Sequence, residues 1–230
     1  MLATNAVAQP YVKMFGGVNY SKLRSESIYF SADYDAGAIV GGALGYRLKA
    51  PVPGEVSLEL EGSHVKANFG SPGTPPPSCV DGVEPSATCL YSADDSFVDD
   101  FAHGNLRSVA GFSNIIYSPP KFHDRFSFYV GAGAGVMRAK FNYQEFVGVE
   151  VIDAIYIGSY VNAEMRQTSF SWQAIGGVAA QLGPHVELFA EGRYRRAVVK
   201  SEVLDSDVFA ALENKTSMVN ALAGVRFSFH

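Results

Sequence analysis

Apolar and polar residues alternate along several stretches of the chain, most clearly between Val219 and Phe229. Every second residue there is apolar, while the intervening positions are small or polar apart from Leu222. A period of two places successive side chains on opposite faces of a β-strand. We therefore expect a strand with one apolar face that ends on an aromatic residue.

Seven further stretches show the same alternation, although it does not settle the facing of residues 105–117. The expected strands cover about residues 11–20, 37–48, 55–69, 105–117, 125–146, 168–182, 186–203 and 219–229. The pattern predicts an all-β fold.

The connections between these strands alternate strictly between short and long. The short ones carry Pro or Gly and cover residues 49–54, 118–124 and 183–185. The long ones cover about residues 21–36, 71–104, 147–167 and 204–217. Outer-membrane barrels combine short periplasmic turns with longer extracellular loops and an even number of strands. We therefore predict an eight-stranded antiparallel up-and-down transmembrane β-barrel over residues 11–229, with both termini in the periplasm.

Three segments carry a resemblance to a known family. They are Tyr129–Val136 (YVGAGAGV), Phe170–Ala174 (FSWQA) and Ala223–Phe229 (AGVRFSF). The chain resembles the OmpA-like family of eight-stranded barrels, which includes small surface antigens of Gram-negative bacteria. The resemblance implies a bacterial outer-membrane location. Phe227 and Phe229 are similar to the C-terminal signal that the barrel-assembly machinery recognises.

The N-terminal segment and the cysteines also indicate export. Ala6-Val7-Ala8 before Gln9 has the small-x-small form of a signal-peptidase site, so we expect residues 1–10 to be a leader remnant or an N-terminal tail. Cys79 and Cys89 lie in a Pro/Gly/Ser-rich segment, and in an oxidising compartment such a pair is expected to form a disulfide. A metal site is the weaker alternative, because the segment contains no histidine and no second cysteine pair.

Composition narrows the class of protein. Hydrophobic residues make up 47% of the chain, yet no apolar run approaches the ~18–20 residues of a transmembrane helix. The net charge of −5 and the lack of a basic stripe argue against a nucleic-acid partner. Aromatic residues near strand ends are typical of interfacial belts. We expect these belts to include Tyr11, Tyr20, Tyr46, Tyr117 and Tyr194.

The faces opposite the apolar ones are expected to fill the barrel. An Arg or Lys facing lipid at the bilayer midplane costs roughly 2–4 kcal/mol, so the charged positions belong inside. There we expect Arg226 to pair with Glu187 or Glu191, and Arg47 with Glu59. The predicted lumen network consists of Lys13, Arg47, Glu59, Glu61, Gln173, Glu187, Glu191, Arg193, Arg195 and Arg226.

This lumen network has two possible roles. We favour a polar plug that fills the interior, and the alternative is a gated path for ions or small solutes. Gly131, Gly133 and Gly135 lack side chains on the inner face. They could leave local room there, so a narrow water path remains an alternative to the plug.

Catalytic chemistry is not indicated. Nucleophilic catalysis needs a Ser, a His and an orienting acid in one place. Ser63 and His64 are successive residues of one strand and therefore lie on opposite faces. The acidic stretch 94–100 lacks the spacing of an EF-hand loop. We expect a non-enzymatic protein with no catalytic residue, metal site or cofactor.

The segment 147–167 is too apolar and β-branched for a free solvated loop. Either the flanking strands extend as a hairpin above the membrane, or the segment packs on a partner. The expected contact residues are Val149, Val151, Ile152, Ile155, Tyr156, Ile157 and Tyr160.

Surface recognition through the loops is therefore the function that we expect. Its expected partners are outer-membrane lipid and lipopolysaccharide, neighbouring proteins or a host surface. A small-solute channel is the main alternative. A soluble ligand-binding barrel of the lipocalin kind is a further one, and its apolar face would lie inside.

Overall fold

The computed structural model describes residues 9–25, 31–33, 36–49, 53–70, 89–92, 102–120, 125–152, 155–198 and 214–229. These residues form long strands and two short ones. The long strands are β1 (Gln9–Ser25), β3 (Gly37–Lys49), β4 (Glu55–Gly70), β6 (Ala102–Ser118), β7 (Phe126–Ile152), β8 (Ile155–Gln181), β9 (Val186–Val198) and β10 (Asn214–Ser228). The short strands are β2 (Ser31–Asp33) and β5 (Cys89–Ser92).

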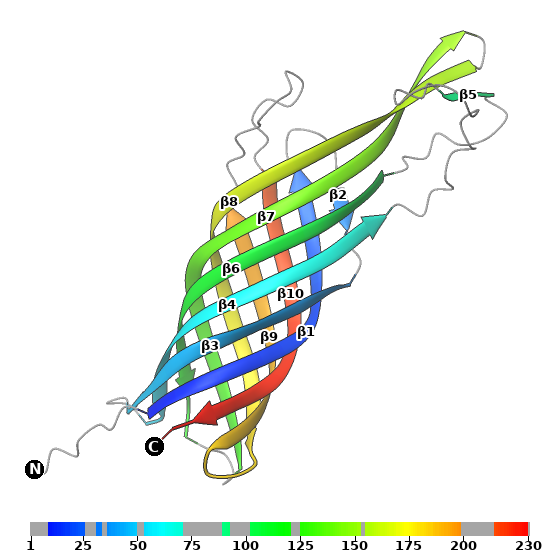
Figure 1. Ribbon diagram of the computed structural model, residues 1–230. Coiled ribbons are helices and arrows are strands. Elements are labelled where there is room, and N and C mark those ends of the chain that lie inside the picture. The colour runs from blue at the N-terminus through cyan, green and yellow to red at the C-terminus, as the bar shows by residue number, and fades with distance from the viewer. Residues whose placement is uncertain are drawn as a thin grey trace, which may run out of the picture.

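The eight long strands close into a barrel (Figure 1). Neighbours pair antiparallel in the order β10-β9-β8-β7-β6-β4-β3-β1, and β10 pairs with β1 to complete the ring. β2 adds to β1, and β5 adds to β8. Closure satisfies the backbone groups of every strand within the wall, which a membrane requires. The predicted eight-stranded antiparallel barrel is confirmed.

The seam between the first and last strands is fully paired. It runs from Tyr11 opposite Ser228 to Ser25 opposite Asn214. Beyond the end of β10, the Phe229 amide donates a hydrogen bond of 2.9 Å to the Pro10 carbonyl. The strand predicted at 219–229 therefore begins earlier, at Asn214.

Alternation separates an apolar outer wall from a polar interior. Leu44, Leu60 and Val130 on the outside are 60–66% exposed, whereas their chain neighbours Ala43 and Glu59 are buried. On β7 the outward positions from Phe126 to Val136 carry only Phe, Val and Ala. At ~3.3 Å per residue and a tilt of roughly 40°, this stretch spans about 25 Å along the membrane normal, the height of the apolar band of a membrane barrel.

The first and last described residues, Gln9 and Phe229, lie at the same end of the barrel as the points where β3 leads to β4, β6 to β7 and β8 to β9 (Figure 1). In the β3–β4 turn, Gly54 has a φ of 120°, a conformation that residues with a side chain rarely adopt. The described residues contain no helix long and apolar enough to cross a membrane.

β7 and β8 are much longer than the other strands and pair with each other to Ile152 and Ile155. They form a hairpin that extends past the barrel rim, where β5 pairs with Ile155–Gly158 of β8 (Figure 1). The connection predicted at 147–167 is therefore mostly strand, in the form of the protruding hairpin.

Candidate functional site in the barrel interior

At the end of the barrel that holds the termini, two arginines share one carboxylate. Arg226 Nη1 lies 2.8 Å and Arg47 Nη2 lies 3.1 Å from Glu187 Oε2. The Arg226 guanidinium also lies 5.0 Å from the centre of the Tyr11 ring. The Tyr11 hydroxyl donates a 2.7 Å hydrogen bond to Glu59. Charge and aromatic surface together fill this layer.

Two predictions about this layer were wrong. Tyr11 does not belong to a lipid-facing belt: it is 2% exposed and faces the lumen, since it has the same parity as the inward residues of β1. Arg47 pairs with Glu55 at 3.4 Å and with the carboxylate described above, and not with Glu59. Alternation sets the face on which a side chain lies, but not the strand that it reaches across the lumen.

The next layer is built on a lysine without solvent contact. Lys13 Nζ lies 2.6 Å from Glu191 Oε2 and 3.8 Å from Glu59 Oε2, and all three side chains are 0% exposed or almost so. The Tyr129 hydroxyl donates a 2.9 Å hydrogen bond to Glu191. The ammonium group lies 4.5 Å from the centre of the Phe189 ring. Each charge here has an opposite charge and a hydrogen-bond partner.

Glu61 is the centre of a third layer. Its carboxylate pairs with Arg193 and, at 2.6 Å, with Arg195. Asn114 and Gln173 donate amide hydrogen bonds of 2.9 and 3.1 Å to its second oxygen. Arg193 also pairs with the glutamate of the layer below, so the charged layers are continuous. These side chains occupy the interior at this height.

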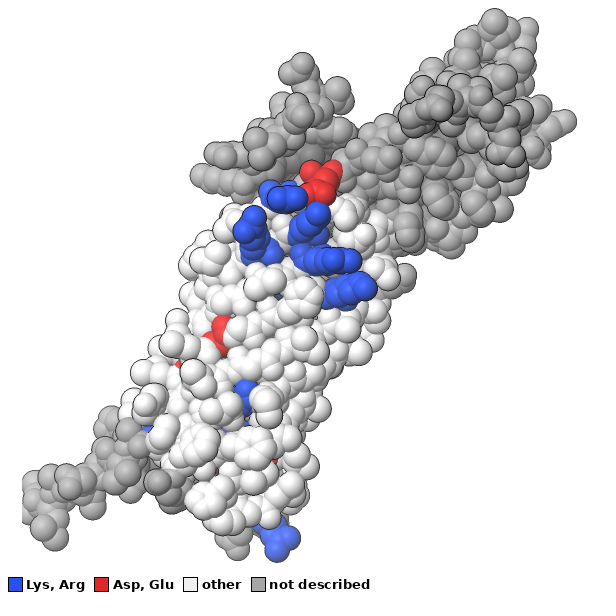
Figure 2. All heavy atoms as spheres, viewed as in Figure 1, with Lys and Arg blue, Asp and Glu red and all other residues white. Residues whose placement is uncertain are grey.

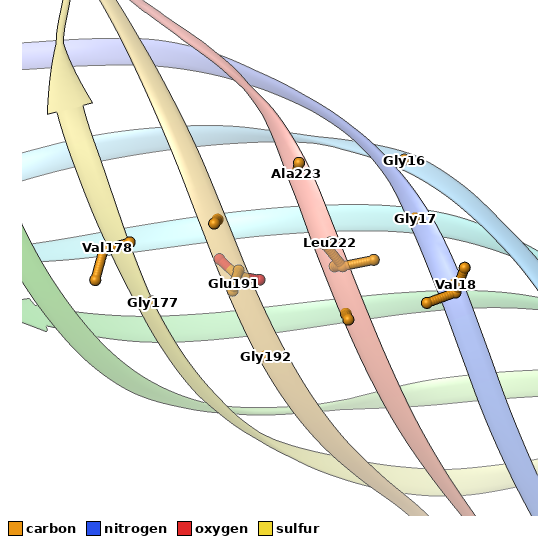
Figure 3. A pocket seen from close by; sticks show the side chains of 11 residues that line it. Gly16, Gly17, Val18, Gly177, Val178, Glu191, Gly192, Leu222 and Ala223 are labelled. Atoms are coloured by element: carbon orange, nitrogen blue, oxygen red, sulfur yellow. The ribbon is translucent and has the colours of Figure 1, made fainter.

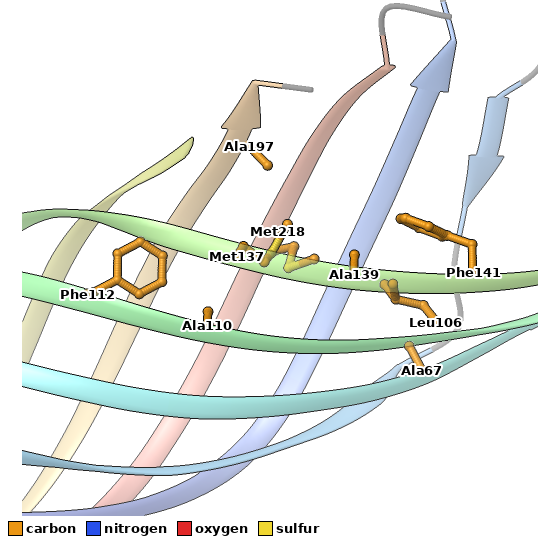
Figure 4. Packing of buried hydrophobic residues seen from close by; sticks show 9 residues of the cluster. All are labelled: Ala67, Leu106, Ala110, Phe112, Met137, Ala139, Phe141, Ala197 and Met218. Carbon is orange, nitrogen blue, oxygen red and sulfur yellow. The ribbon is translucent and has the colours of Figure 1, made fainter. Parts of the chain in front are cut away.

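An apolar cluster fills the lumen above the charged layers, towards the end remote from the termini (Figure 4). It contains side chains from β4, β6, β7, β9 and β10 that meet across the barrel. Its members are Ala67, Leu106, Ala110, Phe112, Met137, Ala139, Phe141, Ala197 and Met218. This cluster was not predicted, because its residues have the apolar character expected of the lipid-facing wall.

Inward glycines accommodate aromatic rings from the neighbouring strand. In four cases the ring belongs to the residue directly opposite, and a Cβ on the glycine would lie 2.3–2.6 Å from a ring atom. The pairs are Tyr11–Gly45, Phe15–Gly41, Tyr129–Gly177 and Phe189–Gly224. An eight-stranded barrel is just wide enough to be filled by side chains, and these pairs supply part of that filling.

The room expected at Gly131, Gly133 and Gly135 is occupied. A Cβ on Gly131 would lie 2.5 Å from the Ile116 side chain, and one on Gly133 would lie 1.9 Å from Asn114 Oδ1. At Gly135 the backbone of β6 approaches as closely. The local room expected beside these glycines is therefore taken up by β6.

All ten residues of the predicted lumen network lie in the interior. Four residues that were not predicted join them, namely Tyr11, Tyr129, Asn114 and Ser63. Each is an even number of positions from a predicted lumen residue or a buried residue of its strand, and this spacing could have identified them. Ser63 accepts a 2.9 Å hydrogen bond from Arg195, while His64 faces outward. The arrangement holds the lumen charges in place by ion pairs and hydrogen bonds.

The remaining predicted site residues lie elsewhere. Phe227 and Phe229 point outward at the end that holds the termini. Cys79, the acidic stretch 94–100 and the side chains of Cys89 and of 149–160 lie outside the described residues. The disulfide and the contact residues of the hairpin stay predictions.

On the outer wall, small residues of β1, β8, β9 and β10 leave a shallow depression (Figure 3). Gly16, Gly192, Ala190, Ala221 and Ala223 are among its lining residues. Backbone and methyl groups make up most of this surface. Glu191 is the one charged residue of its lining, and its carboxylate pairs with Lys13 and Arg193 in the lumen.

The outer wall is apolar over the height of a membrane core, and the charged side chains at that height lie in the lumen of a closed barrel. The chain is an outer-membrane β-barrel. The architecture of this outer-membrane barrel is that of the OmpA-like barrels that its sequence resembles. No protein-family model and no curated protein matches the sequence.

Several solved structures are similar to this outer-membrane barrel in fold. Neisserial surface protein A is 16% identical over 96% of this chain and 97% of its own, with a TM-score of 0.44. The outer-membrane protein OprG from Pseudomonas aeruginosa is 12% identical over 98% and 97%, with a TM-score of 0.45. The outer-membrane protease OmpT from Escherichia coli is 10% identical over 100% and 99%, with a TM-score of 0.45. At such identities, activity has to be argued from the residues of this chain.

Proposed function

We propose that this barrel is a non-enzymatic surface-recognition protein whose β7–β8 hairpin binds a protein partner by strand addition. The observation that carries the proposal is the length of β7 beyond the barrel. β6 pairs with β7 only as far as Ala102 opposite Glu145, while β7 continues to Ile152. Among the described residues, no strand pairs with β7 on that side from residue 146 onward.

An unpaired strand edge presents a row of backbone N–H and C=O groups that a second chain can pair with. Residues 146–152 at ~3.3 Å each give an edge of about 23 Å. On the other side of the hairpin, β8 is already paired with β5. This edge, to which no described strand pairs, and the apolar, β-branched sequence of Val147–Ile152 favour a protein partner over a solvated loop.

The filled lumen supports a structural role for the barrel itself. Buried ion pairs and ring–glycine pairs occupy the interior, so the wall serves as a rigid support for the hairpin. The termini and short turns lie at the opposite end from the hairpin (Figure 1). We take that end as periplasmic, which places the hairpin outside the cell.

A shortened hairpin tests this function. Val147 and Ser159 are directly opposite each other, so replacing residues 148–158 with Asn-Gly joins them through a turn suited to a hairpin. We expect the variant to fold and insert as the wild type does, and to lose the partners that cross-link to the wild type in intact outer membranes. Cross-linked products resolved by mass spectrometry are the measurement.

The matched control shortens the β9–β10 connection by deleting residues 203–210, which leaves the hairpin unchanged. The control should keep its cross-linked partners. If the hairpin variant fails to fold, the hairpin is structural. If it keeps the same partners, recognition lies elsewhere on the barrel. Either outcome contradicts the proposal.

The occluded lumen predicts the absence of a channel. We expect the purified barrel to give no stable conductance in a planar bilayer, because the Glu61 layer and the apolar cluster above it block the interior. An outer-membrane porin in the same bilayer serves as the positive control. Reproducible single-channel steps from this barrel would contradict the interpretation of the lumen network as a plug. They would support the alternative function of a solute channel.

A further inference from the structure

The outer wall carries a row of bases across four adjacent strands. Lys66 of β4 lies opposite Arg107 of β6, which lies opposite Lys140 of β7. Lys140 in turn lies opposite Arg166 of β8. All four side chains are on the outer face. Figure 2 shows Lys and Arg gathered there, near the end remote from the termini, above a largely uncharged wall.

This basic row (Lys66, Arg107, Lys140 and Arg166) places like charges directly opposite one another, which destabilises a sheet in isolation. Arg138 adds a further base two residues from Lys140 on the same face. Among the described outward residues of this region there is one acid, Glu164. It lies 2.8 Å from Lys140 and 2.7 Å from Arg166.

Glu164 stays ionised and still leaves the row with an excess of positive charge. Its pKa lies below the ordinary value because Lys140 and Arg166 donate hydrogen bonds to its carboxylate. Lys66, Arg107 and Arg138 have no acid of this kind beside them within the described part of the wall. The excess charge is therefore available to an anion from outside the chain.

The position of the row indicates where that anion comes from. The next outward residue below Arg107 is Val109, which is 60% exposed, and the one below Arg138 is Val136, which is 54% exposed. Bases thus begin where the apolar band ends, at the level at which lipid head groups lie. A ligand bound there meets charge above and an apolar wall below.

We propose that the basic row binds the phosphate groups of a phosphorylated glycolipid of the outer leaflet, whose acyl chains lie along the apolar wall beneath. Four strands at ~4.8 Å spacing make the row about 15 Å wide, which is enough to contact two phosphates of one head group. Arginine side chains bind phosphate oxygens in pairs, so Arg107 is at the centre of the site. This proposal takes one element from the proposed function, namely that the end of the barrel with the hairpin faces the outside of the cell.

Lipid titration of the full barrel in neutral detergent micelles tests the site. The probes are a diphosphorylated lipid A, the same lipid with both phosphates removed, and inorganic phosphate. We expect the diphosphorylated lipid to bind at least about tenfold more tightly than the dephosphorylated one. Each base near the surface contributes about 1 kcal/mol, so Arg107→Gln should weaken binding about fivefold and Lys66→Gln with Arg107→Gln about 25-fold.

Arg125→Gln is the matched control, because Arg125 is an exposed base at the opposite end of the barrel. It should leave lipid binding unchanged. Equal binding of both lipids, or equal weakening by Arg125→Gln and Arg107→Gln, would overturn the proposal. Inorganic phosphate that competes as strongly as the lipid would also overturn it, since the acyl chains would then contribute nothing.

The shortened-hairpin variant separates this proposal from the proposed function. It keeps the basic row, so its lipid binding should equal that of the wild type even when its protein partners are lost. Loss of lipid binding in this variant would place the lipid on the hairpin and overturn the site. Loss of protein partners alone leaves the lipid site standing.

Discussion

Replacing Glu61 with glutamine is expected to lower the free energy of unfolding by about 3–5 kcal/mol, because it leaves buried positive charge uncompensated. The carboxylate pairs with Arg193 and Arg195, and none of the three side chains is more than 3% exposed. A neutral amide still accepts hydrogen bonds but no longer offsets the two guanidinium charges. The low polarity of the interior makes this loss far larger than at a surface.

The measurement is a urea titration of the barrel refolded in lipid vesicles, followed by the fluorescence of Trp172. This residue is the single tryptophan and lies on the outer wall, where its ring is 5.5 Å from that of Tyr194. Glu55→Gln is the matched control: the Glu55 side chain is 48% exposed and pairs with Arg47. A surface pair of this kind contributes at most about 1 kcal/mol. Equal losses in the two variants would show that the buried network is no stronger than a surface ion pair.

Replacing Gly177 with alanine is expected to destabilise the barrel by about 1–3 kcal/mol through overpacking of the lumen. The added Cβ would lie 2.4 Å from the Tyr129 ring and 2.8 Å from the Ala190 carbonyl oxygen. The ring would have to move away from Glu191, to which its hydroxyl donates a hydrogen bond. The same urea titration measures the loss.

Gly176→Ala provides the control one residue away. Gly176 faces outward, and a Cβ there would contact nothing within 4 Å. We expect its stability to stay within about 0.5 kcal/mol of the wild type, as for an ordinary surface substitution. Equal stability of the two alanine variants would mean that the Tyr129 ring can move aside without cost. The ring–glycine pairs would then not fill the interior as described.

Much of the fold was predictable because a membrane barrel wall has only two faces and lipid tolerates few charges. On β3, the alternation predicts that the face with the larger apolar side chains lies towards lipid; Val40 and Leu44 belong to it, and both are more than half exposed. The inward set includes Ile39 and Ala43, and both are buried. A two-residue period carries this information without any knowledge of the neighbouring strands.

Contacts across the lumen were not predictable in this way. Which acid Arg47 reaches depends on barrel closure and strand tilt, and β9 supplies Glu187 from far along the chain. The alternation does not settle which face of β6 lies inside, because Leu106 and Phe112 on the inside and Val109 on the outside are all apolar. Both faces of β6 are apolar, one against lipid and one against the apolar cluster in the lumen. The alternation therefore cannot tell the two faces apart, and only the closed barrel shows which one lies inside.

The ring–glycine pairs also bear on how the strands find their alignment during assembly. A shift of β1 against β3 by one residue would turn charges towards lipid and is excluded by solvation. A shift by two residues keeps every side chain on its proper face. It would, however, set Tyr11 opposite Ala43 or Arg47 in place of Gly45, and each of these has a side chain where the Tyr11 ring lies against Gly45. The alternating pattern alone does not distinguish the native alignment from one shifted by two residues. The ring–glycine pairs do, because each large ring needs a glycine opposite it.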